Sequence, residues 1–278
     1  MTQEKRLIFL DIDGTLTEGG TNTPPASALE AIRRARANGH LVALCSGRNL
    51  GMLSPVRAYG FDGTVASAGG YILWGEQVIY DCPMTMEQQT RAMEVFARNN
   101  VARVAETRDH GFMDQSFSSQ ASGNASEEDN SELVRWRRRL EENLGALPMS
   151  QYDGAPLYKL VFMCKDPAAL DEPRRVLEEE FQFCVQGVNR FGLLNGELIN
   201  RKFNKGIAIR RVCRHLGFPM ENTVAFGDSM NDLEMIETAG LGVCMGNGSP
   251  ALKERADAIC PPVDEDGLYC GFQQCGLI

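Results

Sequence analysis

Two aspartates separated by one residue end an apolar run near the start of the chain. The run reads RLIFLDID and finishes in Asp11 and Asp13. A short apolar run of this kind predicts a buried strand, and in extended backbone both carboxylates point to the same side. A turn or a calcium loop is the alternative for the motif alone. The calcium loop is disfavoured, because it would need Gly at Leu16 and Glu at Asn22.

A second acidic motif, GDSMND, follows the apolar run TVAF in the last third of the chain. Asp228 and Asp232 lie four residues apart, with Asn231 between them. Two carboxylates at the end of a buried strand are costly unless a cation neutralises them. A helix-capping aspartate would explain only one of the two. The motif therefore favours a cation site.

Two further segments carry groups that bind anions. Ser46, Gly47 and Arg48 follow the apolar run LVALC, and Lys205 opens the helical pattern KGIAIRRVCRHLG. A hydroxyl and free backbone N–H groups at a helix N-terminus suit an anionic oxygen. Taken alone, each segment has a simpler interpretation, a plain serine cap for Ser46 and a solvated lysine for Lys205. The argument for an anion site is that all four motifs occur together.

The elements that precede these motifs predict a parallel sheet. The run RLIFLDID, the amphipathic stretch ASALEAIRRARANG and the run from His40 to Cys45 form a strand, a helix and a strand in under 40 residues. The last third repeats this alternation, with strands at Thr223 to Phe226 and Gly242 to Met245. We therefore expect an α/β fold, a Rossmann-like parallel-sheet core with helices on both faces. In such sheets ligands bind beyond the carboxyl ends of the strands.

The middle of the chain has a different order of helical and strand-like patterns, which predicts an inserted α/β domain. We place the core at residues 1–81 and 190–278 and the insert at residues 82–189. Helical patterns in the insert alternate with single strand-like runs, and a polar stretch at residues 116–131 is interpreted as a mobile loop. The helices are expected at Thr85 to Asn99, Glu132 to Leu144 and Pro167 to Glu180, and the strands at Val101 to Glu106, Tyr158 to Cys164, Phe181 to Val185 and Phe191 to Leu194.

Composition limits the classes of partner. The 278 residues carry a formal net charge of −9, which argues against binding to nucleic acid. No apolar run reaches the roughly 18 residues of a membrane helix, and we read no signal peptide. Nine scattered cysteines without a Cys-x-x-Cys pair suit free thiols in a reducing cytoplasm. We expect a cytoplasmic protein, a monomer or a weak homodimer.

The four motifs, in this order and spacing, resemble those of the haloacid dehalogenase superfamily, specifically the Cof-type hydrolases with a large α/β cap. The resemblance covers nearly the whole chain and rests on LDIDGTLT, CSGR, Lys205 with Gly206, and GDSMNDLEM, with CMGNGSPALKERADAI and EDGLYCG near the end. Two departures stand out. Ala68 begins AGG where relatives often have Asn-Gly-Ala, and Ser46 stands where many have Thr.

The resemblance implies a phosphatase mechanism in which acidic residues do the chemistry. Asp11 would be the nucleophile that becomes an aspartyl-phosphate. Asp13 would protonate the leaving alcohol and later activate water. Mg²⁺ would lie between Asp11, the backbone carbonyl of Asp13 and Asp228, with Asp232 acting from behind these ligands or through water.

The resemblance also implies a set of residues that bind the phosphoryl oxygens. Ser46, Gly47 and Lys205 would contact the non-transferring oxygens, and Asn231 would hold Lys205 or Ser46 in place. The substrate would be a small phosphorylated metabolite, with a sugar phosphate expected first, and the cap would choose among substrates. A phosphomutase of the same superfamily and a non-catalytic sensor of phosphorylated ligands are the alternatives.

Overall fold

The computed structural model describes residues 4–117, 146–188 and 193–278, and the chain divides into two compact units. The first unit comprises residues 1–48, 53–81 and 203–278, and the second comprises residues 49–52 and 82–202. The predicted loop at 116–131, from residue 118 on, and the predicted helix at 132–144 lie outside the described residues.

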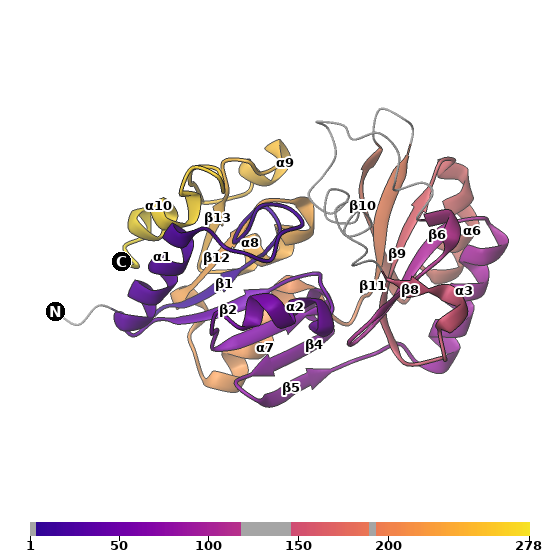
Figure 1. Cartoon of the computed structure of the whole chain (residues 1–278), viewed down its shortest axis with the longest axis horizontal. Coiled ribbons are helices and arrows are strands. Elements are labelled where there is room, and N and C mark those ends of the chain that lie inside the picture. Colours follow the sequence, from indigo (N-terminus) through magenta and orange to yellow (C-terminus); the bar gives the residue numbers. More distant parts are fainter. Residues whose placement is uncertain (1–3, 118–145, 189–192) are drawn as a thin grey trace. The chain divides into compact units, whose positions relative to one another are not determined.

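An eight-stranded sheet forms the centre of the first unit, in the order β14-β13-β12-β1-β2-β3-β4-β5 (Figure 1). Neighbours from β14 to β3 are parallel, whereas β4 and β5 are antiparallel additions at one edge. The strands are β1 (Leu7–Leu10), β2 (Leu41–Cys45), β3 (Gly63–Ala66), β4 (Tyr71–Trp74), β5 (Gln77–Asp81), β12 (Thr223–Gly227), β13 (Leu241–Cys244) and β14 (Ala258–Ile259). The expected α/β class with a parallel-sheet core is confirmed.

Helices cover both faces of this sheet because successive residues of its central strands point to opposite faces. Leu7 and Phe9 pack with Ile209 of α7 and Met235 of α8 in one core cluster. On the opposite face, the ring of Phe226 contacts that of Phe272 in α10, which packs against α1. The helices are α1 (Ala26–Ala37), α2 (Leu50–Arg57), α7 (Lys205–Leu216), α8 (Leu233–Thr238), α9 (Pro250–Lys253) and α10 (Gly267–Gln274).

The chain leaves the neighbouring strands β1 and β12 toward opposite edges of the sheet. From β1 it runs through α1 to β2 on one side, and from β12 it runs through α8 to β13 on the other side. Where strand order reverses in this way, the loops after two adjacent strands diverge and leave room for a ligand. Asp11 follows β1 and Asp228 follows β12, so both lie at this switch point.

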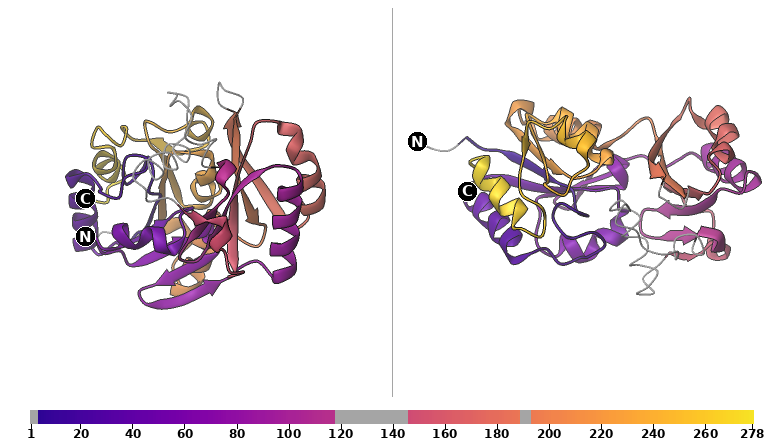
Figure 2. Two further views of the ribbon diagram at one scale, coloured as in Figure 1. Left: turned by 45° about the vertical axis from the view of Figure 1, so that its right-hand side comes forward. Right: turned by 90° about the horizontal axis from the view of Figure 1, so that it is seen from above.

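The second unit contains a six-stranded, mostly antiparallel sheet in the order β10-β11-β9-β6-β7-β8. Two helices, α3 (Met86–Arg98) and α6 (Asp171–Leu177), lie on one of its faces (Figure 2). Phe96 of α3 and Leu177 of α6 belong to the core cluster between these helices and the sheet. On the other face, Lys159 is buried between the carboxylates of Glu106 and Glu197. The strands are β6 (Ala102–Thr107), β7 (Gly111–Met113), β8 (Leu147–Pro148), β9 (Leu157–Cys164), β10 (Phe181–Val188) and β11 (Leu194–Asn200).

Some local predictions need correction. The last strand of the insert, expected at Phe191 to Leu194, is β11 at Leu194–Asn200, and residues 191–192 lie outside the described part. The helix expected at Pro167 to Glu180 is a 3₁₀ turn (Pro167–Leu170) followed by α6.

All nine cysteines are free thiols, as expected. Among the described residues, no helix is both long and apolar enough to cross a bilayer.

Gly206 lets α7 and α8 approach each other closely. A Cβ built on Gly206 would lie 2.3 Å from the backbone oxygen of Glu234 and 2.6 Å from Oγ1 of Thr238. Real Cβ atoms do not come this close to backbone oxygen, so one helix would have to move. Gly206 follows Lys205, and α8 follows Asp232. The close contact between the two helices therefore fixes the distance between Lys205 and Asp232.

We predict that Gly206→Ala lowers the free energy of unfolding by about 1–3 kcal/mol, the usual cost of overpacking. Alanine favours helix over glycine by about 1 kcal/mol, so without the clash the same change would stabilise the protein. Urea unfolding of Gly206→Ala beside Arg210→Ala, at an exposed position of α7, measures the effect. An unchanged or higher stability of Gly206→Ala would show that the two helices adjust freely.

Candidate active site

Lys205 is buried between two carboxylates at the carboxyl end of the sheet. Its ammonium nitrogen lies 2.6 Å from Oδ1 of Asp11 and 2.5 Å from Oδ1 of Asp232. Only 1% of the lysine is exposed, so the alternative of a solvated helix-start lysine is excluded. Asn204 fixes the helix start, since its side-chain oxygen accepts a hydrogen bond from the N–H of Ile207 at 2.7 Å.

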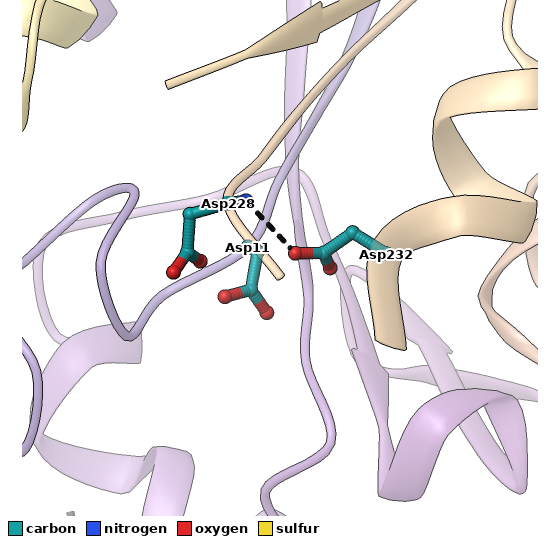
Figure 3. A group of neighbouring side chains, drawn as sticks. All are labelled: Asp11, Asp228 and Asp232. Atoms are coloured by element: carbon teal, nitrogen blue, oxygen red, sulfur yellow. Dashed lines mark hydrogen bonds between the residues drawn. The ribbon is translucent and has the colours of Figure 1, made fainter. Parts of the chain in front are cut away.

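Asp228 completes an acidic group that comes from two adjacent strands. Ligand atoms of Asp11, Asp228 and Asp232 lie within 4.8 Å of one another. Figure 3 shows the three side chains together and the hydrogen bond from the backbone N–H of Asp228 to Oδ2 of Asp232, at 3.0 Å. The N–H of Ser229 donates to the same oxygen at 3.1 Å. Both oxygens of Asp232 therefore already accept hydrogen bonds.

Gly14 leaves room for the Asp228 carboxylate. Its φ is +86°, and a Cβ there would lie 2.4 Å from Oδ2 of Asp228. The hydroxyl of Thr15 donates to Oδ1 of Asp228 at 3.3 Å, and Asn247 donates its side-chain N–H to the carbonyl of Gly14 at 2.8 Å. The loop after β1 thus shapes the space around Asp228, and Asn247 holds this loop in place.

Burial disfavours the ionised forms of Asp11 and Asp228. It raises the pKa of Asp11 to about 7, with the charge of Asp232 adding to the effect and Lys205 opposing it. Burial and the charges of Asp232 and Asp11 hold the pKa of Asp228 well above its ordinary value. For Lys205, burial favours the neutral amine, but Asp11 and Asp232 outweigh it and hold the pKa well above its usual range. Burial also raises the pKa of the neighbouring Cys45 thiol.

Arg48 binds Asp13 with two parallel hydrogen bonds. Its Nε lies 2.8 Å from Oδ2 and its Nη2 lies 2.6 Å from Oδ1 of Asp13, and both side chains are buried. The guanidinium is held in turn by the side-chain oxygen of Asn22 at 2.6 Å and the carbonyl of Thr21 at 3.0 Å. Such bidentate pairs fix geometry as well as charge.

The loop after β2 brings Ser46 and Gly47 into the buried region, with Ser46 2% exposed. The Ser46 hydroxyl accepts a hydrogen bond from the N–H of Arg48 at 3.2 Å. The helix cap expected of Ser46 is made instead by Asn49, whose side-chain oxygen accepts from the N–H of Met52 at 2.9 Å. The alternative of a plain serine cap is therefore wrong.

The remaining site residue, Asn231, is partly exposed. Its side-chain oxygen accepts a hydrogen bond from the Ser229 hydroxyl at 2.7 Å, whereas the two ion pairs of Lys205 go to aspartates. Its expected role in holding Lys205 or Ser46 stays a prediction. Sequence reasoning gave no separate role to Arg48 or Asn247, although both lie within the quoted motifs. The signal available for Arg48 was its positive charge in a segment that follows a strand, as the two acidic motifs do.

The donor set fits a small, hard divalent cation. Four carboxylates lie here, and the two cations Lys205 and Arg48 balance only part of their negative charge. The carboxylates are those of Asp11, Asp13, Asp228 and Asp232. Carboxylate oxygens are the ligands that Mg²⁺ prefers. Because both oxygens of Asp232 are engaged, Asp11 and Asp228 are the better candidates for direct ligands.

Comparisons with known proteins assign the chain to a family. The family model of haloacid dehalogenase-like hydrolases matches residues 8–271. YkrA of Bacillus subtilis is 29% identical over 276 residues, 99% of each chain, and the pyridoxal phosphate phosphatase YbhA of Escherichia coli is 27% identical over 91% of this chain and 92% of its own. The solved structure of the HAD subclass IIB sugar phosphatase BT4131 superposes with a TM-score of 0.77 at 23% identity, covering 98% of this chain and all of that one. The resemblance seen in the motifs is thereby confirmed, and the chain belongs to the haloacid dehalogenase-like hydrolases.

Proposed function

We propose that this hydrolase is a magnesium-dependent phosphatase that cleaves a phosphomonoester of a small metabolite through an aspartyl-phosphate on Asp11. The observation that carries the proposal is the position of Lys205, whose buried ammonium contacts Asp11 at 2.6 Å. A cation at this place orients the attacking carboxylate and offsets the charge of an incoming phosphoryl group. A sugar phosphate is the first candidate substrate.

Asp11 is suited to attack phosphorus because Lys205 positions its carboxylate and little of it is exposed to water. Lys205 holds its carboxylate through Oδ1, and only 5% of the residue is exposed. A positioned carboxylate avoids most of the entropy cost of bringing two reactants together. The bound Mg²⁺, held by Asp11 and Asp228, would neutralise negative charge on the phosphoryl oxygens.

Asp13 would protonate the leaving alcohol and later activate water, and its ion pair with Arg48 affects both proton transfers. The bidentate pair stabilises the ionised carboxylate, the form that activates water in the second step. Protonation of the leaving alcohol in the first step requires the carboxyl to exchange Arg48 for a new partner. Ser46, Gly47 and Lys205 would bind the phosphoryl oxygens that do not react.

The second unit would act as the cap that selects the substrate. The core residues handle a phosphoryl group that all such esters share, so selection needs other side chains. The name of the relative YbhA, a pyridoxal phosphate phosphatase, supports a small phosphorylated metabolite. We keep residues 82–189, which fall within the second unit, as the proposed cap. A cytoplasmic monomer or weak homodimer is the proposed state.

Product analysis tests the proposal against its alternatives. Release of inorganic phosphate from a panel of phosphorylated metabolites is expected. An isomerised sugar phosphate would indicate a phosphomutase, and tight binding without turnover would indicate a sensor. No observation on the described residues favours either alternative.

Asp11→Asn should reduce turnover at least about a hundredfold with the fold intact, because the change removes the nucleophile but is nearly isosteric. The matched control is Asp264→Asn, at an exposed position. Steady-state hydrolysis of p-nitrophenyl phosphate and circular dichroism of both variants measure the effect. A tenth of wild-type activity in Asp11→Asn would mean that the nucleophile is another group.

Removal of divalent cations should abolish hydrolysis, and Mg²⁺ should restore it. Ca²⁺ should restore little, because its longer bonds and higher coordination number would displace Asp11 from its attacking position. The measurement is phosphate release after exhaustive chelation and after addition of each ion. Full activity in the chelated protein would remove the metal from the mechanism.

Asp13→Asn should slow hydrolysis of alkyl phosphates about 10²- to 10⁴-fold, the usual contribution of a general acid and base. With p-nitrophenyl phosphate, whose leaving group needs no proton, the first step should survive and the second should not. A burst of p-nitrophenol close to one equivalent per enzyme is therefore expected in rapid-mixing experiments. Equal slowing of both ester classes without a burst would contradict this assignment.

A further inference from the structure

The loop after β3 holds an unusual backbone conformation. Ser67 and Ala68 have φ values of 49° and 56°, and Gly69 follows with 106°. Left-handed backbone is costly for residues with a Cβ and is uncommon outside Gly, Asn and Asp. Two adjacent non-glycine residues in this region are maintained only where surrounding contacts require it.

Contacts on one side tie this loop to the loop that carries Ser46. The N–H of Ser67 donates to the carbonyl of Arg48 at 2.8 Å, and the N–H of Ala68 donates to the carbonyl of Ser46 at 3.0 Å. These two hydrogen bonds fix Ser67 beside one of the proposed phosphate-binding segments.

On its other side, the same loop packs against the start of α7. A Cβ on Gly69 would lie 2.7 Å from the carbonyl oxygen of Asn204, the residue before Lys205. The loop therefore lies between the two segments that carry the proposed phosphate ligands Ser46 and Lys205. Both segments contact it directly.

The hydroxyl of Ser67 has no hydrogen-bond partner within the described part of the chain, although the residue is only 1% exposed. A hydroxyl offers one donor and two acceptor positions, and burying it unpaired is unfavourable. Neither the left-handed backbone nor the two N–H contacts of this loop require a hydroxyl. Packing alone thus does not account for serine at this position.

We propose that Ser67 is a further phosphate-binding residue, whose hydroxyl donates a hydrogen bond to a non-transferring oxygen of the phosphoryl group. This inference rests on the proposed function, which supplies that group. An anionic oxygen is a strong acceptor, and a hydrogen bond to it is shorter and stronger than one between neutral groups. The strained backbone then serves to hold the hydroxyl in place before the substrate arrives.

Three variants test the proposal. Ser67→Ala removes the hydroxyl and keeps the same backbone preference. Ser67→Gly removes it and also relieves the strain. Ala68→Gly is the matched control, since it relieves strain at the next residue without changing a polar group. The readouts are kcat/KM for p-nitrophenyl phosphate, the inhibition constant of inorganic phosphate, and the melting temperature.

We expect Ser67→Ala and Ser67→Gly to lower kcat/KM at least tenfold and to weaken inhibition by inorganic phosphate. Ser67→Gly and Ala68→Gly should melt at a higher temperature than the wild type, and Ala68→Gly should keep its activity. The proposal is overturned if Ser67→Ala keeps both constants within twofold of the wild type. An equal loss in Ala68→Gly would also overturn it, because the effect would then belong to the backbone.

These outcomes separate the inference from the proposed function. If the wild type releases no phosphate from any ester, but calorimetry shows that Ser67→Ala weakens its binding of inorganic phosphate, the proposed function fails and the inference holds. If the wild type is an active phosphatase and the Ser67 variants match it, only the inference fails.

Discussion

The ion pairs of one buried lysine make the rest of the site possible. Three aspartates meet at the carboxyl ends of β1 and β12, and burial raises the free energy of the ionised carboxylates of Asp11 and Asp228. The ammonium of Lys205 offsets part of this cost by contacting Asp11 and Asp232. Its own position depends on a capped helix start at Asn204 and on the absence of a side chain at Gly206. Folding of α7 and assembly of the acidic group are therefore coupled.

The loops around this lysine are connected to one another before any ligand binds. Arg48 links the loop after β2 to Asp13 in the loop after β1, and Asn247 links that loop to the segment after β13. The loop after β3 is hydrogen-bonded to Ser46. Except for the pair of Arg48 and Asp13, which the proposed first step would open, these hydrogen bonds need no reorganisation during a reaction, and that is the condition for strong electrostatic stabilisation of a transition state. The surrounding close contacts, such as that of Gly14 with Asp228, leave little freedom for rearrangement.

Local patterns in the sequence predicted the strands and helices that carry the motifs, because apolar runs and capping residues act over a few positions. The antiparallel strands β4 and β5 were not predicted, since pairing direction depends on the short connections at residues 67–70 and at Gly75 rather than on periodicity. Likewise, the pairing of Arg48 with Asp13, 35 residues apart, is a tertiary contact that spacing does not encode. The backbone conformation of Ser67 was equally hidden, because serine is a residue that does not favour it.

The cysteine beside the site has a chemical consequence. Cys45 precedes Ser46, is fully buried, and has its pKa raised chiefly by that burial. A thiol that stays protonated is a poor nucleophile, and oxidants and alkylating agents react with the thiolate. Although this sulfur atom lies on β2, the strand paired with β1, and its thiol feels the charge of Asp11, it does not compete with the proposed nucleophile Asp11 for an electrophilic substrate, and it offers peroxide no thiolate to attack. The proposed active site is thereby protected against oxidation at this cysteine.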